Sequence, residues 1–244
     1  MTKYESLPSG AACATYNDVI PKSFELASGD EEHIAVISDH IKKHLGPINN
    51  VFHEIISDQV HVDVYLVKPT ASIPYNILIT SGMSDKPMNV PNGREELRFA
   101  ELCILLPSDW PLDIESFNDE NNYWPVRWLK QLARFPHEYD TFFCLEHTIS
   151  GEENEPVSSN CSFCGFLFFT PMSLPKDFCN LKLENNDIIH FYCLIPLYKE
   201  EIELKNNKGL DELLKRFSQS GLTDVVNINR PNCCTKRKKL WGLW

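Results

Sequence analysis

Apolar, strand-like runs that follow one another with few helices between them restrict the fold of this chain most. The runs are rich in β-branched and aromatic residues and are bounded by turn residues, which is typical of strands. They lie at 51–57, 60–67, 75–81, 98–106, 141–149, 163–170 and 187–198. Because these runs are grouped rather than alternating with helices, the sequence predicts an α+β fold with a mixed, largely antiparallel sheet. Only Asp58-Gln59 separates the first two runs, so we expect a hairpin with one face in solvent.

Three segments carry the apolar periodicity of helices that would flank this sheet. In residues 30–45, isoleucines and a leucine recur at helical spacing after an acidic start, and Gly46-Pro47 ends the pattern. Residues 124–135 predict a helix with proline in its first turn and Trp128 on its buried side. Residues 209–221 predict a last amphipathic helix.

The length of 244 residues suits one domain with a sizeable core. We assign this domain to residues 30–220, an N-terminal extension to residues 1–29, and a basic, tryptophan-containing tail to residues 221–244. We expect Trp241 and Trp244 of the tail to dock on the domain, because two indoles left in water would form an exposed apolar patch.

Charge and cysteine content limit the partners and the compartment. The 23 Lys+Arg against 34 Asp+Glu give a formal net charge of −11, which disfavours binding to nucleic acid or to an anionic membrane surface. The sequence has no secretory signal pattern, and no stretch approaches the roughly 18 apolar residues of a membrane span. The nine cysteines are odd in number and most lie in strand-like runs, which predicts reduced thiols and a cytoplasmic location.

The stretch ILITSGMSDKPM, from Ile77 to Met88, ends a strand in a polar turn that contains one glycine. Its hydroxyl groups are candidate nucleophiles, but a Gly-x-Ser-x-Gly elbow is absent and one glycine cannot build a phosphate-binding loop. We therefore predict no catalytic residue and expect an architectural turn. Gly82 is then expected at a positive φ, and Ser81 and Ser84 are each expected to make a turn hydrogen bond.

Two pairs of residues have metal-like spacing. Cys161 and Cys164 form half of a zinc knuckle, but no second pair of ligands is evident, so packed cysteines are favoured and a zinc-dependent domain is the alternative. His40 and His44 lie one helical turn apart, but no glutamate follows the first, so neutral surface histidines are favoured. The sequence therefore predicts no metal and no other cofactor.

Several motifs, taken in order, resemble the Suppressor of fused domain of bacterial proteins. They are ILITSGMSDKPMNVP, RFAELCILLPSDWPL, YWPVRWLKQLARFPHEYDTFF, GFLFFTPMSLP and the later strand IHFYCLIPLYKEEIEL. The resemblance covers roughly residues 30–220, and the order of the motifs makes it specific.

This resemblance implies a binding protein rather than an enzyme. The animal member of the family sequesters transcription factors by capturing a peptide segment, and many bacterial members resemble immunity proteins or antitoxins. The chain is short for the second domain of the animal regulator, so we expect a bacterial, cytoplasmic immunity protein that binds a cognate toxin encoded nearby. The alternatives are a regulator that sequesters a transcription factor and a zinc-dependent domain that uses Cys161 and Cys164. The resemblance assigns no partner-binding residue, and the oligomeric state stays open.

Overall fold

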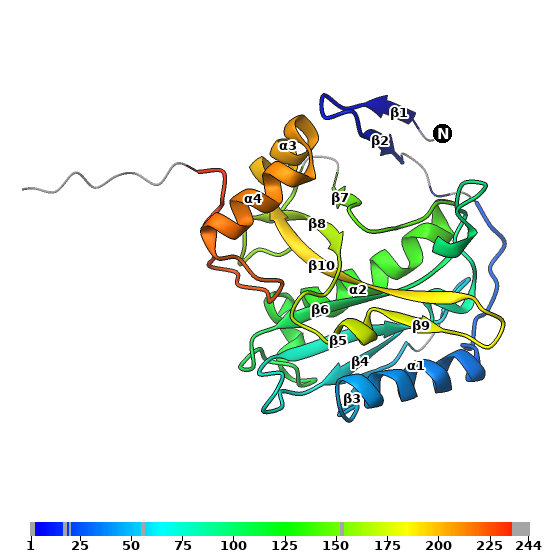
Figure 1. Cartoon of the computed structure of the whole chain (residues 1–244). Coiled ribbons are helices and arrows are strands. Elements are labelled where there is room, and N and C mark those ends of the chain that lie inside the picture. Colours follow the sequence, from blue (N-terminus) through cyan, green and yellow to red (C-terminus); the bar gives the residue numbers. More distant parts are fainter. Residues whose placement is uncertain (1–2, 17–18, 20, 55–56, 152–153, 236–244) are drawn as a thin grey trace, which may run out of the picture.

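A computed structural model describes residues 3–16, 19, 21–54, 57–151 and 154–235 of the chain (Figure 1). Within these residues an eight-stranded sheet forms the centre of the fold. Its strands are, in spatial order, β3 (Asn50–Phe52), β4 (Asp63–Val67), β5 (Asn76–Ser81), β6 (Phe99–Leu106), β10 (Ile188–Tyr198), β8 (Phe163–Phe169) and β7 (Thr148–Ser150), with β9 (Asn180–Lys182) paired to β10. All pairs in this sheet are antiparallel except β6 with β10. The predicted α+β fold with a mixed, largely antiparallel sheet is confirmed.

Helices cover both faces of the sheet (Figure 1). They are α1 (Glu31–His44), α2 (Glu120–Glu138), α3 (Lys199–Lys208) and α4 (Leu210–Ser220). The residues of β10 show which helix covers each face of the sheet, because successive side chains of a strand point to opposite faces. Leu194 packs in the core with α2, whereas Phe191 packs with α1 and Leu197 packs with α3 and α4. One face is therefore covered by α2, and the other by α1 and the α3–α4 pair.

The first helix follows its sequence pattern closely. Asp30 caps α1, because its carboxylate accepts hydrogen bonds from the backbone N–H groups of Glu32 and His33 at 2.9 and 3.0 Å. Ile37 and Ile41 are fully buried against the sheet. The helix predicted in residues 30–45 is confirmed.

Two of the predicted strands differ from the structure. We expected the hairpin of β3 and β4 to leave one face in solvent, but every residue of β4 is buried. Val64 packs with α2 and Tyr65 packs with α1, so helices cover both faces of this strand. The alternation of apolar and polar residues in the sequence therefore does not indicate a face in solvent. The run at 141–149 forms a strand only from Thr148, where β7 begins, because residues 141–147 are an irregular connection with a turn at 145–146.

The helix predicted at residues 124–135 starts earlier than expected. Its N-terminal cap is Asp119, so Pro125 lies inside α2 rather than in its first turn. Proline has no N–H for the carbonyl four residues before it, which is that of Asn121. The side-chain amide of Asn160 donates to this carbonyl at 3.3 Å and replaces part of the missing bond. The indole of Trp124, not that of Trp128, is the fully buried one.

Among the described residues, one α-helix and three strands were not predicted. They are α3, the short strand β9, and β1 (Lys3–Ser6) and β2 (Ala12–Thr15), which form a separate hairpin. The segment KEEIELKNNK of α3 has little apolar periodicity. Its position depends instead on Glu201, which is fully buried and forms a two-armed ion pair with the guanidinium of Arg230 at 2.5 and 2.6 Å. This pair attaches the segment after α4 to the α3–β10 corner.

All nine cysteines are free thiols, and Cys103 and Cys193 are fully buried on adjacent strands, as predicted for small core residues. Trp241 and Trp244 lie outside the described residues. No helix in the described part of the chain is long and apolar enough to cross a membrane.

Candidate functional site

The 80–84 turn is organised by one buried carboxyl group. Glu101, on the neighbouring strand β6, is fully buried and accepts the backbone N–H groups of Gly82 and Ser84, both at 3.0 Å. It also accepts the hydroxyl groups of Ser84 and Thr80, both at 2.6 Å. Thr80 Oγ1 in turn accepts the backbone N–H of Leu102 at 2.8 Å, so the hydroxyl connects the two strands.

This arrangement leaves no nucleophile in the turn. Burial raises the pKa of Glu101 above its usual value, and the hydrogen bonds from Ser84 and Thr80 oppose the rise. The hydroxyl groups of Ser84 and Thr80 are committed to Glu101, and neither is solvent-accessible. The hydroxyl of Ser81 is also buried and has no hydrogen-bond partner within the described residues. The hydroxyl groups of Thr80 and Ser84 thus serve internal hydrogen bonds, whereas the hydrogen bond that we expected for Ser81 is absent among the described residues.

Gly82 is required by a close approach of two backbone segments. Its φ is +120°, and a Cβ built at this position would lie 1.8 Å from the carbonyl oxygen of His61. The next residue, Met83, contacts α2, because its carbonyl oxygen accepts a hydrogen bond from His137 Nε2 at 2.9 Å. Desolvation lowers the pKa of His137 to about 4, so this imidazole is neutral and carries its proton on Nε2.

The other residues with metal-like spacing do not assemble into a site. Cys161 donates to the carbonyl of Ser158, and burial raises the pKa of both Cys161 and Cys164. His40 Nε2 donates to the carbonyl of Phe178 at 3.0 Å, and its ring stacks on that of Phe178. His40 is therefore a buried, satisfied histidine, not the surface histidine that we expected.

A candidate surface lies at the connection from β6 to α2, residues 107–119. This acidic connection contains four acidic residues and no lysine or arginine. Its two ends are anchored by aromatic contacts: Trp110 packs edge-to-face on Trp124 at 5.8 Å and Phe117 on Phe52 at 4.9 Å between ring centroids. Between these anchors Ile114 projects into solvent with 80% of its surface exposed.

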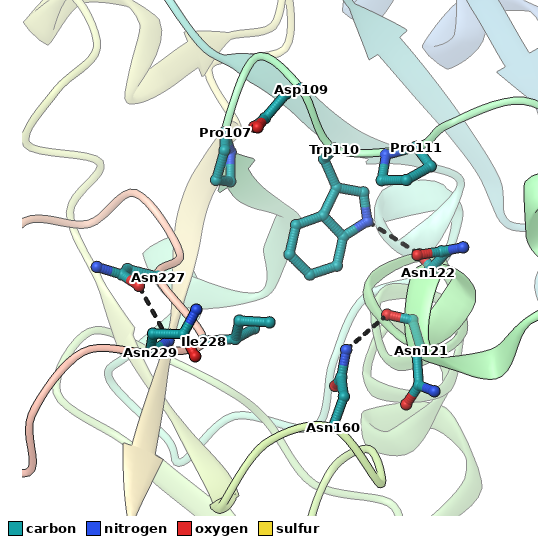
Figure 2. A pocket seen from close by; sticks show the side chains of 10 residues that line it. All are labelled: Pro107, Asp109, Trp110, Pro111, Asn121, Asn122, Asn160, Asn227, Ile228 and Asn229. Atoms are coloured by element: carbon teal, nitrogen blue, oxygen red, sulfur yellow. Dashed lines mark hydrogen bonds between the residues drawn. The ribbon is translucent and has the colours of Figure 1, made fainter.

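A cavity of about 310 Å³ lies on one side of the acidic connection (Figure 2). The indole of Trp110 forms part of its wall and donates from Nε1 to the carbonyl of Asn122 at 3.0 Å. Amide side chains from α2, the 154–162 loop and the segment after α4 line much of the rest; they belong to Asn121, Asn122, Asn160, Asn227 and Asn229. The remaining lining residues are Pro107, Asp109, Pro111 and Ile228. An aromatic face surrounded by amide donors and acceptors suits a peptide backbone with an apolar side chain.

A second cavity of about 560 Å³ lies on the other side of the connection. Its lining comes from the start of the edge strand β3, the end of β4 and the middle of the connection, and consists of Asn49, Asn50, Leu66, Lys68, Leu112, Asp113, Ile114 and Glu115. The two cavities share no lining residue, but both are lined by the acidic connection, which also carries the exposed Ile114. We take the connection with its two cavities as the candidate surface. The sequence did not predict this surface, because both cavities combine segments that are distant in the chain.

Comparison with known proteins gives the family of this fold. The sequence profile of the family described as Suppressor of fused protein (SUFU) matches residues 58–231. A crystal structure of a SUFU homologue from Neisseria gonorrhoeae FA 1090 matches with a TM-score of 0.62 and 18% identity, over 85% of this chain and 100% of that chain. A comparison with curated proteins returned no match.

Two further solved structures share the fold. A chain of the Sufu–Fu complex crystal structure matches with a TM-score of 0.58 and 15% identity, over 82% of this chain and 91% of that chain. Drosophila Suppressor of Fused matches with a TM-score of 0.56 and 14% identity, over 84% of this chain and 54% of that chain. The chain thus spans about half of the Drosophila structure.

Proposed function

The chain belongs to the Suppressor of fused family, and we propose that it is a non-catalytic binding protein that neutralises a toxin through a one-to-one complex. The observation that carries the proposal is the state of the 80–84 turn, whose hydroxyl groups are buried and mostly committed to Glu101. This turn has no exposed group that could attack a substrate. One of the matched structures is a Sufu–Fu complex, which supports a protein as the partner.

We assign the partner-binding role to the acidic connection and its two cavities. Ile114 supplies an exposed apolar anchor, and the acidic residues around it favour a partner whose contact surface is basic. Toxins that cleave nucleic acid are basic where they bind phosphate, so a nuclease toxin encoded nearby is the proposed partner. The free thiols of all nine cysteines agree with a cytoplasmic site of action.

The first test is co-expression of the chain with the toxin encoded beside it. We expect restored growth and a complex that elutes with one copy of each protein. If no neighbouring gene product is neutralised or bound, the immunity role is wrong. If the chain instead recovers a DNA-binding protein from cells, the partner is a transcription factor.

Three variants locate the binding surface. Ile114→Ala should weaken the complex by about 10-fold or more, since anchor residues commonly contribute more than 1 kcal/mol to binding. The double variant Asp109→Lys/Glu115→Lys reverses two exposed charges of the acidic connection and should slow association. The matched control is Asp177→Lys/Glu184→Lys, which changes the net charge equally at two exposed acids elsewhere. Equal binding by the two double variants would place the surface away from the connection.

A further inference from the structure

Two histidines and an aspartate meet where β3 and β4 leave the sheet. His53 follows the last residue of β3, Asp63 is the first residue of β4, and His61 lies two residues before it. His53 Nδ1 lies 2.8 Å from Asp63 Oδ2, and His61 Nε2 lies 3.1 Å from Asp63 Oδ1. One ligand atom from each residue can be chosen so that all three lie within 4.8 Å of one another.

The hydrogen bonds behind His61 determine which of its nitrogens carries a proton. Glu54 forms an ion pair with Arg134 and accepts the hydroxyl of Ser57 at 2.6 Å. The single hydroxyl proton of Ser57 is used in this bond, so at the 2.8 Å contact between Ser57 Oγ and His61 Nδ1 the imidazole must be the donor. A neutral His61 then directs the lone pair of Nε2 toward the carboxylate of Asp63.

A lone pair and a carboxylate oxygen at 3.1 Å repel each other unless a cation lies between them. A divalent metal ion would meet this need and would also engage His53. The chain of Glu54, Ser57 and His61 has the arrangement by which a carboxylate, here through a hydroxyl, orients a metal-binding histidine.

We propose that His53, His61 and Asp63 bind a late first-row divalent cation, with zinc as the preferred ion. Zinc binds imidazole nitrogen and carboxylate oxygen at about 2.0–2.2 Å, which places neighbouring ligand atoms about 3.3 Å apart in a tetrahedral site. The 2.8 and 3.1 Å contacts are made to different oxygens of Asp63. One ligand atom from each of the three residues lies within 4.8 Å of the others, so side-chain rotations bring all three around one ion.

The surroundings allow an ion to enter and keep the ligands in place. The side chain of His53 is 69% exposed, whereas those of His61 and Asp63 are 18% and 9% exposed, so the site opens to solvent on one side. Asp63 Oδ1 also accepts the backbone N–H of Glu54 at 3.2 Å, which fixes the carboxylate. With the charge of Glu54 balanced by Arg134, Asp63 supplies the negative charge that attracts the cation.

The nearby cation Lys130 does not occupy the site. Its Nζ donates to the backbone carbonyl of His53 at 3.1 Å, and burial lowers the pKa of its amine. A bound ion would tie the end of the edge strand β3 to the start of β4 across the connection between them. Zinc should therefore cross-link β3 and β4 and stabilise this edge of the sheet. One coordination position is left for water or for a partner's side chain.

Zinc binding to the isolated, tag-free chain tests the proposal without any partner. After treatment with chelator, we expect one zinc per chain by calorimetry, with a Kd of micromolar or lower. At a hundredfold excess over Kd, zinc should raise the Tm by about 5–10 °C, whereas magnesium should not. Cobalt(II) should give the visible absorption of a site with nitrogen and oxygen ligands.

Variants assign the ligands. His53→Ala is expected to fold normally, because this side chain is mostly exposed, and to weaken zinc binding at least 10-fold. Ser57→Ala should weaken it about 10-fold through the lost orientation of His61. The matched control His44→Ala removes an imidazole of the other histidine pair and should bind zinc as the unchanged chain does.

Two results would overturn the assignment. The first is the absence of saturable zinc binding below about 100 μM, which would mean that hydrogen bonds alone join the two histidines to Asp63. The second is zinc binding that survives His53→Ala and is lost in Cys164→Ser, which would move the metal to the thiols.

Discussion

The backbone at position 82 accommodates only glycine without strain, and replacing Gly82 measures the cost of that strain. Gly82→Ala would place a methyl group against the carbonyl of His61 at a φ of +120°. We expect the free energy of unfolding to fall by about 3 kcal/mol or more, because backbone strain and a clash add. The matched control is Gly93→Ala, which has a φ of +83° but open space around the new Cβ, and should cost about 1 kcal/mol. Urea denaturation of both variants checks the difference, and equal losses would contradict the close approach.

The two serines of this turn should respond differently to alanine. Ser84→Ala removes a buried hydrogen bond to Glu101 and should cost about 1–2 kcal/mol of unfolding free energy. Ser81→Ala removes a buried hydroxyl with no partner among the described residues, so the change should lie within about 0.5 kcal/mol of zero or be stabilising. Thermal melts and partner-binding assays on both variants provide the measurement. A Ser81→Ala protein that is stable but unable to neutralise its partner would show that the turn has a chemical role.

One contact between two elements should make the free energy of unfolding depend on pH. His137 joins α2 to the turn through the carbonyl of Met83, and its pKa is lowered from 6.5 to about 4. The unfolded chain therefore takes up a proton below pH 6.5 that the folded chain does not take up until about pH 4. Stability from this group is present above pH 6.5 and falls by about 3 kcal/mol as the pH drops to 4.

The variant His137→Gln isolates this contribution, because the carboxyl groups titrate alike in both proteins. Denaturation of the two proteins at a series of pH values should show a flatter curve for the variant between pH 6.5 and 4. Parallel curves would mean that His137 is charged in the folded state.

Charge acts over the entire protein and should govern how fast the partner arrives. With a net charge of −11 and an acidic connection at the proposed surface, association with a basic partner should slow about 10-fold between 20 and 200 mM salt. Stopped-flow measurements should show a weaker salt dependence for Asp109→Lys/Glu115→Lys than for the control pair at Asp177 and Glu184. An association rate that does not change with salt would exclude electrostatic steering.

Local patterns were sufficient for much of the fold. Helix α1 was predictable because its cap, apolar stripe and stop signal lie within one continuous segment, and strands β5, β6, β8 and β10 were predictable because each is an apolar run bounded by turn residues. The absence of a nucleophile elbow in the 80–84 turn was also visible in the sequence. The family resemblance followed from the order of these segments, since order along the chain is the information that a sequence carries directly.

Tertiary contacts decided the remainder. Burial of both faces of β4, the start of α2 before Pro125, and the helix α3 around Glu201 all depend on partners that are distant in the chain. The same holds for Glu101 beneath the turn. His53 and Asp63 are only ten residues apart, and they meet because β3 pairs with β4. Hydrogen bonds and packing contacts form between residues that are close in space. Local sequence patterns do not show which residues of different segments become close in the folded chain. For this reason the chain's motifs revealed its family, whereas the candidate binding surface and the candidate zinc site became visible only in the folded structure.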